Sequence, residues 1–370
     1  MLTGFAFSLT YAVFAIPLAR MADTGHRVRL LSICVGVWSI ATVLAGTVTS
    51  YIQMVLTRIV VGIGEAGGNP VSVSLIGDYY EPETRTRGLS FFNLGASMGA
   101  FFGLAAVGAI ADQLGWRVAF YAMGLPGILL AILILITLKE PKRGRFQDDS
   151  VSYDTDINWW QAITDVLSRW TVRHGLIGFA IVSFGGSGVG AWFGAFFMRA
   201  HDLSLTEVGA VIGLVLGISG FAGTLLGAVF TPMLVRRDRR WEMWLPGLVY
   251  AIVLPLYMYV FYSENLTTVF IVLGIVAFIG GTAGAPILSA IQSVLPAHLR
   301  AMGMALIMFA ANFIGAGAGP VLVGWASDAL APIYGTDSLR YALMIGVAFV
   351  GWGLAHFFLA SKHIKRELIS

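Results

Sequence analysis

Residues 70–88, PVSVSLIGDYYEPETRTRG, return in altered form as residues 286–303, PILSAIQSVLPAHLRAMG. Aligning the two stretches pairs Arg87 with Arg300. Self-similarity at a fixed spacing is the mark of a repeated structural unit. We therefore expect two halves of similar fold joined in one chain.

Three further correspondences support the same repeat. Asp23, in LARMADTGHRVR, matches Asp238, in PMLVRRDRRW, at nearly the same spacing as Arg87 and Arg300. The stretch 93–112, which begins with Asn and ends with Asp, matches the stretch 312–328, again at nearly this spacing. Four offsets that agree within six residues indicate one duplication that covers most of the chain.

The composition indicates that the two halves lie in a membrane. Of the 370 residues, 57% are hydrophobic and only 12% are charged, whereas soluble domains carry about 25% charged residues. A single soluble core stops growing at roughly 250–300 residues, so water could not accommodate this much apolar surface. The one cysteine, Cys34, excludes a disulfide framework and a thiolate metal site.

Eleven apolar runs are long enough to cross a bilayer, which takes about 20 residues per helix. Turn-like or charged breaks such as DTGHRVR and EPETRTRG separate them. None alternates as a barrel strand would, so an all-α membrane protein is expected. The runs lie near residues 1–19, 30–49, 52–79, 88–111, 117–138, 174–198, 207–234, 243–262, 267–295, 302–325 and 340–360.

The basic residues predict the orientation of these helices. Nineteen of the 23 Lys and Arg residues fall in the odd-numbered loops and the C-terminal tail. Basic loops stay in the cytoplasm, which predicts a multi-pass membrane protein with a cytoplasmic C-terminus. We expect the membrane to be the bacterial inner membrane.

The repeat also predicts the domain organisation. The second half starts with the run 174–198, whose counterpart would precede Met1. We therefore expect two pseudo-symmetric six-helix bundles, with the first helix of the N-terminal bundle absent from this chain; a natural eleven-helix chain is the alternative. The expected parts are an N-terminal bundle over 1–140, a cytoplasmic linker with an interfacial helix over 141–171, and a C-terminal bundle over 172–370.

Two ionisable residues lie deep inside the third run. Seven residues separate Arg58 from Glu65, which is two helical turns and about 10 Å, so both side chains face the same way. Ionisable groups at this depth are costly in lipid and mark functional cavities. We expect Glu65 to be a proton site and Arg58 its electrostatic partner; a static charge pair that fixes helix packing is the alternative.

Several polar residues of other runs are candidates for the wall of a substrate cavity, with interhelical hydrogen bonds as the alternative. They are Asn93, Ser187, Trp192, Thr282, Gln292 and Asn312. Enzyme motifs are not found: there is no HExxH, no GxSxG and no phosphate-binding loop. The six histidines show no metal spacing. We expect no enzyme, no cofactor, no metal and no nucleic-acid partner.

Four strings resemble the Spinster-type branch of the major facilitator superfamily. They are RIVVGIGEAGGNPVSVSLIGDYY (58–80), GWRVAFYAMGLPG (115–127), LKEP (138–141) and LIMFAANFIGAGAGPVLVGWASD (306–328). The most specific element is R-x(3)-G-x(2)-E-A, here Arg58, Gly62, Glu65 and Ala66, which organic-anion:cation symporters also carry in similar form.

The resemblance implies a major facilitator fold and proton-coupled movement of lysophospholipids or sphingoid phosphates, with Glu65 as a protonation site and Arg58 as its electrostatic partner. We expect a monomer. A further family acid usually lies in the first helix. The loop around Asp23 and Arg27 is similar to the family pattern G-x-L-A-D-R-x-G-R-R. In the family such charges latch the halves at the cytoplasmic face, and Asp78 is expected to join this gate; a solvated, topology-setting loop is the alternative.

The function expected is a secondary active transporter that works by alternating access, coupled to H⁺ rather than Na⁺. Its substrate is expected to be an amphiphile, because the second half carries no clear charge within its helices. A proton-coupled organic-anion symporter or a drug exporter of the same superfamily is the first alternative. A non-transporting membrane receptor or scaffold is the alternative from another class.

Overall fold

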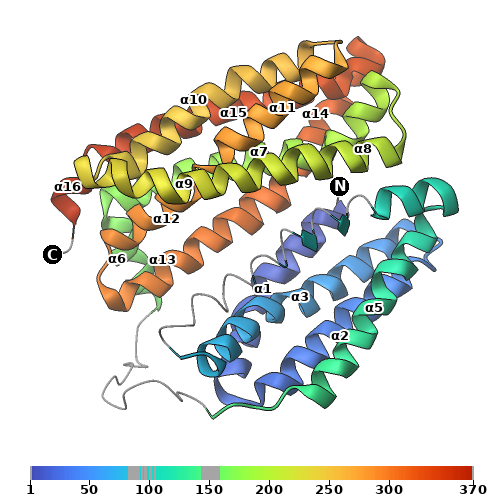
Figure 1. Ribbon diagram of the computed structural model, residues 1–370, viewed down its shortest axis with the longest axis horizontal. Coiled ribbons are helices and arrows are strands. Elements are labelled where there is room, and N and C mark those ends of the chain that lie inside the picture. Colours follow the sequence, from blue (N-terminus) through green and yellow to red (C-terminus); the bar gives the residue numbers. More distant parts are fainter. Residues whose placement is uncertain are drawn as a thin grey trace. The chain divides into compact units, whose positions relative to one another are not determined.

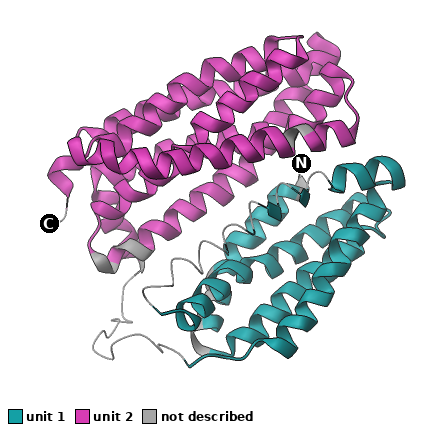
Figure 2. Cartoon of the chain, viewed as in Figure 1, with its two compact units in different colours: residues 1–154 teal, residues 155–370 magenta. Residues whose placement is uncertain are grey.

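The computed structural model describes residues 2–81, 106–142 and 159–368, together with 92, 95, 98–99 and 102–103. These residues form helices and connecting turns, with no strand among them. The chain divides into two compact units, residues 1–154 and residues 155–370 (Figure 2).

Unit 1 is built on α2 (Arg27–Ala45), which packs against both α3 (Tyr51–Tyr79) and α5 (Trp116–Thr137). A further helix, α1 (Leu2–Thr24), packs on α3, as Figure 1 shows in blue. Residues 106–114 are also helical. Each of the four labelled helices is therefore held by at least one long neighbour from the same unit.

Local sequence explains where α3 begins. Ser50 adopts an extended backbone, its hydroxyl accepts from the Gln53 amide, and the Gln53 side chain accepts in turn from the Ser50 amide. This capping box satisfies two amides that a helix start leaves without partners. It places the start of α3 at Tyr51.

Unit 2 contains the remaining elements. Their bounds are α6 (Trp159–Ser168), α7 (Trp170–His201), α8 (Leu205–Val211), a π-helical turn (Ile212–Leu216), α9 (Gly217–Arg237), α10 (Trp241–Tyr262), α11 (Leu266–Gly281), α12 (Gly284–Ser293), α13 (Ala297–Phe309), a second π-helical stretch (Ala310–Ala318), α14 (Gly319–Tyr334), a 3₁₀ turn (Gly335–Asp337), α15 (Ser338–Ser361) and α16 (Ile364–Glu367). The π-helical turns interrupt two otherwise continuous spans.

Helix α7 is central to unit 2, since it contacts α15, α14, α12 and α6. Glycine permits this close packing. A Cβ at Gly185 would lie 3.0 Å from the Gly346 carbonyl of α15, and one at Gly188 would lie 3.1 Å from the Gly319 carbonyl of α14. Small residues let backbones approach in lipid, where dispersion replaces the hydrophobic effect between helices.

The described part of the chain contains eight helical stretches that are long and apolar enough to cross a membrane. One of them, residues 302–361, covers two of the runs predicted from the sequence. Large apolar side chains cover the outside: Leu129 is 68% exposed and Ile136 is 72% exposed. The prediction of an all-α, multi-pass membrane protein is confirmed. Half of the predicted run 88–111 lies outside the described residues.

Candidate functional site

Arg58 and Glu65 lie on α3 of unit 1, two turns apart, and both side chains are only partly accessible. They are within electrostatic range of each other but do not form an ion pair within 4.0 Å. The Arg58 guanidinium lies over the ring of Phe120 on α5, with its Cζ 5.0 Å from the ring centroid. A cation over an aromatic face is held by the ring quadrupole, so Phe120 is a partner of Arg58.

Glu65 faces the junction of α3 with α1. Gly62, one turn earlier, lies so close to α1 that a Cβ there would be 2.6 Å from the Phe7 carbonyl oxygen. This close approach brings Tyr11 of α1 within electrostatic range of the Glu65 carboxylate. The glycine of the R-x(3)-G-x(2)-E-A element therefore positions a neighbouring hydroxyl-bearing side chain near the acid.

A network of charges joins three helix ends at the other end of α3. Arg27, whose side chain is 2% exposed, donates through Nη1 to Asp78 Oδ2 over 2.5 Å and to Ser74 Oγ over 3.1 Å. Its Nε donates to Glu140 Oε1 over 2.7 Å, and its Nη2 donates to the Pro141 carbonyl. The start of α2, the end of α3 and the residues after α5 are thereby tied together.

Two of the three residues predicted as a gate meet in this network, namely Arg27 and Asp78. Asp23 lies in the last turn of α1, and its side chain is outside the described residues. Glu140, which sequence reasoning did not single out, is the second carboxylate of the network. The contacts of Arg27 and Asp78 described here all lie within unit 1, so the latch between halves stays a prediction.

Glu140 is further held by the backbone of α2. The Val28 amide donates to Glu140 Oε2 over 2.9 Å, and His26 Nδ1 lies 3.1 Å from the same oxygen. Burial on its own would raise the pKa of Glu140. The Val28 amide and the Arg27 guanidinium outweigh this and hold the pKa of that carboxyl below its ordinary value.

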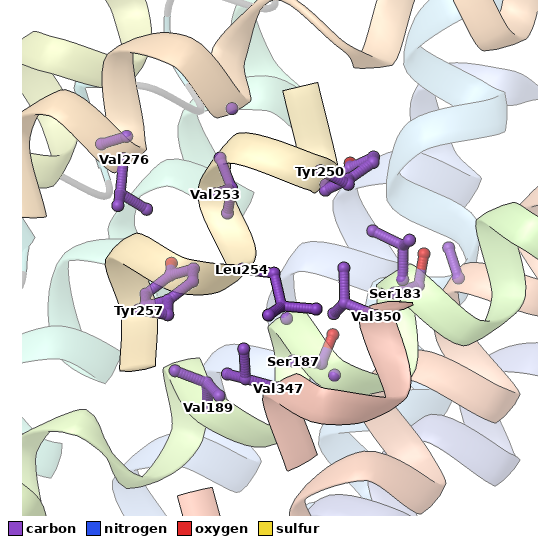
Figure 3. Close-up of a pocket in the computed structure, with 16 residues that line it drawn as sticks. Ser183, Ser187, Val189, Tyr250, Val253, Leu254, Tyr257, Val276, Val347 and Val350 are labelled. Atoms are coloured by element: carbon purple, nitrogen blue, oxygen red, sulfur yellow. The ribbon is translucent and has the colours of Figure 1, made fainter. Parts of the chain in front are cut away.

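Unit 2 contains a cavity of about 390 Å³ between α7, α10, α11 and α15. Figure 3 shows its aliphatic wall, which includes Val253 and Val350, and four hydroxyl-bearing side chains. The hydroxyls belong to Ser183, Ser187, Tyr250 and Tyr257. Among the described residues, no acidic or basic one lines it. A mostly apolar pocket with a few polar groups is the usual form of a small-molecule site.

The residues predicted for a cavity wall separate into two groups. Ser187 lines the cavity of unit 2. Three others make local or interhelical hydrogen bonds and do not line it: Trp192 Nε1 donates to the Pro320 carbonyl, Thr282 Oγ1 to the Ile279 carbonyl, and Asn312 Nδ2 to the Met308 carbonyl. Asn93 lies outside the described residues.

Sequence reasoning missed both cavity tyrosines and one buried acid. Tyr250 and Tyr257 are seven residues apart on α10, which places their rings on one helix face. Glu242, in the first turn of α10, is 1% exposed. The seven-residue spacing of the tyrosines could have indicated a shared helix face in the cavity wall. The burial of Glu242 could not be predicted in this way, because the basic residues before it are typical of an exposed loop. Within the described part of the chain, no three His, Cys, Asp or Glu side chains are grouped to hold a metal ion.

Two helical units with a repeated sequence, an apolar exterior and buried ionisable residues are typical of a multi-pass membrane transporter. The chain belongs to the Major Facilitator Superfamily, whose family model matches residues 1–320. It is similar to an MFS-type efflux pump of Mycolicibacterium smegmatis, with 31% identity over 100% of this chain and 85% of the relative.

Other relatives differ in what their names say they carry. The sphingosine-1-phosphate transporter SPNS2 of Danio rerio is 26% identical over 93% of this chain and 71% of the relative. A probable L-galactonate transporter of Escherichia coli is also 26% identical, over 97% of this chain and 80% of the relative.

A solved structure matches the fold closely. It is an inward-facing, unoccupied bacterial homologue of the human lysosomal transporter Spinster, with a TM-score of 0.87 and 27% identity, covering 100% of this chain and 91% of that one. The predicted major facilitator fold and the predicted likeness to the Spinster-type branch are both confirmed.

Proposed function

We propose that this protein is a proton-coupled secondary transporter of an amphiphile with an anionic head group, such as a lysophospholipid or a sphingoid phosphate. It would work by alternating access in the bacterial inner membrane, as a monomer. The observation that carries the proposal is the state of Arg58: a guanidinium inside a membrane helix whose described neighbours include an aromatic face but no carboxylate at ion-pair distance.

A guanidinium in this position is suited to an anionic ligand. Its donors match phosphate geometry in a bidentate fashion, and the guanidinium is more weakly hydrated than an ammonium. Phe120 contacts Arg58 through its ring, which cannot accept a bidentate hydrogen bond from the guanidinium as a phosphate can. We infer that the head-group phosphate binds this guanidinium.

Glu65 provides the coupling in this proposal. Its carboxylate, within electrostatic range of Arg58, neutralises part of the positive potential that the substrate needs. Protonation of Glu65 removes that competing charge, so the anion and the proton favour each other's binding. Linkage requires the effect to be reciprocal: bound substrate must raise the affinity of Glu65 for a proton.

The cavity of unit 2 suits an apolar chain. It is lined mainly by valine, leucine, glycine and alanine, and none of the described residues in its wall is charged. The relatives that are named as sphingosine-1-phosphate transporters favour the same class of substrate. These two observations are the reason to prefer an amphiphile to a small anion.

A polyhydroxy organic acid is the second candidate. The four hydroxyls in the cavity of unit 2 would suit it, and one relative is named a probable L-galactonate transporter. Export of an unrelated drug is the third, because another relative is named an efflux pump. All three candidates share the fold and the coupling residues and differ in the substrate alone.

The remaining roles extend this proposal. Asp23, Arg27 and Asp78 are proposed as the cytoplasmic gate, and residues 141–171 as the linker between an N-terminal bundle (1–140) and a C-terminal bundle (172–370). Asn93, Ser187, Trp192, Thr282 and Asn312 are proposed to contact substrate during the transport cycle. Ser187 is the best supported, because it lines the cavity of unit 2, whereas Trp192, Thr282 and Asn312 do not. The C-terminus is proposed to be cytoplasmic.

The test is flux of a fluorescent lysophospholipid in proteoliposomes under an imposed pH gradient. We expect gradient-driven flux in the wild type, its loss in Glu65→Gln, and retention of flux in Glu207→Gln, a matched change at an exposed glutamate. Flux of a small sugar acid without flux of lysolipid would replace the substrate class. Gradient-driven flux that persists in Glu65→Gln would contradict the coupling role.

A further inference from the structure

The repeat places an acid in unit 2 where unit 1 has a base. Asp23 corresponds to Asp238, and the same spacing along the chain takes Arg27 to Glu242. Both side chains are buried at the start of a long helix: Arg27 is 2% exposed at the start of α2, and Glu242 is 1% exposed at the start of α10.

The partners of the two residues follow the same spacing. In unit 1, Arg27 Nη1 donates to Ser74 Oγ over 3.1 Å and to Asp78 Oδ2 over 2.5 Å. At the spacing of Asp23 and Asp238, Ser74 and Asp78 correspond to Ser289 and Ser293, one residue from the register that pairs Pro70 with Pro286. The repeat has therefore kept the geometry of contact between two helix ends while exchanging the charges.

In unit 2 those serines hold the acid. Ser289 Oγ donates to Glu242 Oε1 over 2.8 Å, and Ser293 Oγ lies 3.4 Å from Oε2 while its hydroxyl also bonds the Ala290 carbonyl over 2.9 Å. A cation, Arg239, approaches Oε1 at 3.4 Å, but its side chain is 39% exposed. Glu242 thus joins the start of α10 to the end of α12 with neutral donors inside and one solvated charge outside.

Other charges near this position do not act on Glu242. Helices α11 and α12, both packed on α10, carry no acidic or basic side chain. The acidic or basic groups of the remaining neighbours, α9 and α15, are Arg236, Arg237, Arg340 and His356, and among described residues only Arg239 interacts electrostatically with the carboxylate. Asp238 is engaged by Lys365, with Nζ 2.8 Å from Oδ2.

The chemical consequence differs between the units. Protonating either carboxylate beside Arg27 would remove one of the two counter-charges of a buried guanidinium, so the charges of unit 1 favour one another's ionised form. Protonating Glu242 leaves no buried charge without a partner. The serine hydroxyls can turn to accept a hydrogen bond from the protonated carboxyl, and the exposed Arg239 side chain can be solvated by water. A carboxyl whose buried partners are all neutral can bind and release a proton without leaving a buried charge unpaired.

We propose that Glu242 is a second proton-binding site, at the end of unit 2 that carries its basic loops, and that its protonation loosens the junction of α10 with α12. The proposal goes beyond the transport mechanism above and stands whichever substrate the protein carries. In unit 1 ion pairs hold the corresponding junction, so the two junctions should differ in how they respond to acid.

Infrared difference spectroscopy of the reconstituted protein, recorded between mildly alkaline and mildly acidic pH without substrate, tests this directly. Protonated carboxyls give a C=O stretching band, and Glu242→Gln should remove one such band. Glu207→Gln, which changes an exposed glutamate that also bonds a serine, should leave that band unchanged. A Glu242→Gln spectrum that superimposes on the wild-type spectrum would overturn the proposal.

A second variant covers the case in which Glu242→Gln does not fold. Replacing Ser289 and Ser293 together by alanine keeps the carboxyl and removes its neutral donors. The assigned band should then move to higher frequency, because a carboxyl C=O stretch rises as hydrogen bonds are lost; an unmoved band would count against the assignment. Neither readout uses lysolipid flux, so a failed transport assay and a failed proton site are distinguished.

Discussion

Arg27 Nε donates to Glu140 Oε1 over 2.7 Å, and this bond ties the first turn of α2 to the residues that follow α5. The same guanidinium also binds Asp78 at the end of α3. One buried cation therefore serves two carboxylates, one at the end of α3 and one beyond α5. These contacts of Arg27 all lie within unit 1, so they stabilise this unit independently of any role in gating.

Replacing Arg27 by alanine should destabilise unit 1 severely. The change leaves the carboxylates of Asp78 and Glu140 without their shared cation, and breaking a buried pair in this way costs about 3–5 kcal/mol. Thermal unfolding of the detergent-solubilised protein measures the effect. Arg29→Ala, at an exposed position two residues away, is the control and should change stability little. A stable Arg27→Ala protein that has only lost flux would instead assign Arg27 to gating alone.

Glu140 should make the stability of unit 1 sensitive to acid. Because its pKa is depressed in the folded protein, its contribution is present above the unfolded pKa of about 4.3 and is lost as pH falls through the lower folded value. Stability measured against pH should therefore fall on the acid side in the wild type. In Glu140→Gln that fall should be shallower, from a lower starting stability. Glu264→Gln, at an exposed glutamate, should reproduce the wild-type slope.

The sequence predicted the fold well because its main determinants are local or periodic. Apolar run length identifies a spanning helix without knowledge of its neighbours. The seven-residue spacing of Arg58 and Glu65 gives two helical turns in any α-helix, so their shared face followed directly. The internal repeat then divided the helices into two units, because matching residues such as Asp23 and Asp238 are separated by a nearly constant number of residues along the chain.

The contacts across helices were not predictable in the same way. The stack of Arg58 on Phe120 and the bond from Arg27 to Glu140 depend on how helices rotate against each other, which a single sequence does not encode locally. Glu242 was passed over because it follows RRDRRW, a string typical of a solvated loop. Its correspondence with Arg27 in the repeat was the one available indication that this position is buried.

Phe120→Leu should weaken binding of an anionic amphiphile. The substitution keeps an apolar side chain but removes the aromatic face that orients Arg58, an interaction worth about 0.5–2 kcal/mol. The dissociation constant should rise by up to about 30-fold, the equivalent of about 2 kcal/mol. Phe120→Tyr keeps the ring and should bind as the wild type does. Equal affinities for Phe120→Leu and the wild type would show that Arg58 is positioned by other contacts.

Gly62→Ala should separate α1 from α3. Its Cβ would lie 2.6 Å from the Phe7 carbonyl oxygen, a backbone atom that cannot turn aside, so the helices must move apart. Overpacking of this kind costs about 1–3 kcal/mol. Gly77→Ala on the same helix meets no atom within 4 Å and should not lower stability. Comparable unfolding temperatures for the two variants would mean that α1 is not held against α3 in solution.

Two substitutions at Ser187 should separate the candidate substrates. Ser187→Leu extends a bulky side chain into the 390 Å³ cavity and should block any ligand that occupies it, with folding intact because the site is hollow. Ser187→Ala keeps the space and removes one hydroxyl.

An apolar chain does not need that hydroxyl, so lysolipid flux should survive in Ser187→Ala and fail in Ser187→Leu. In Ser187→Ala a polyhydroxy acid would lose a hydrogen bond of about 0.5–1.5 kcal/mol, and in Ser187→Leu it would be blocked. Its flux at limiting concentration should therefore fall in both variants. Lysolipid flux that is unchanged in Ser187→Leu would place the chain outside this cavity.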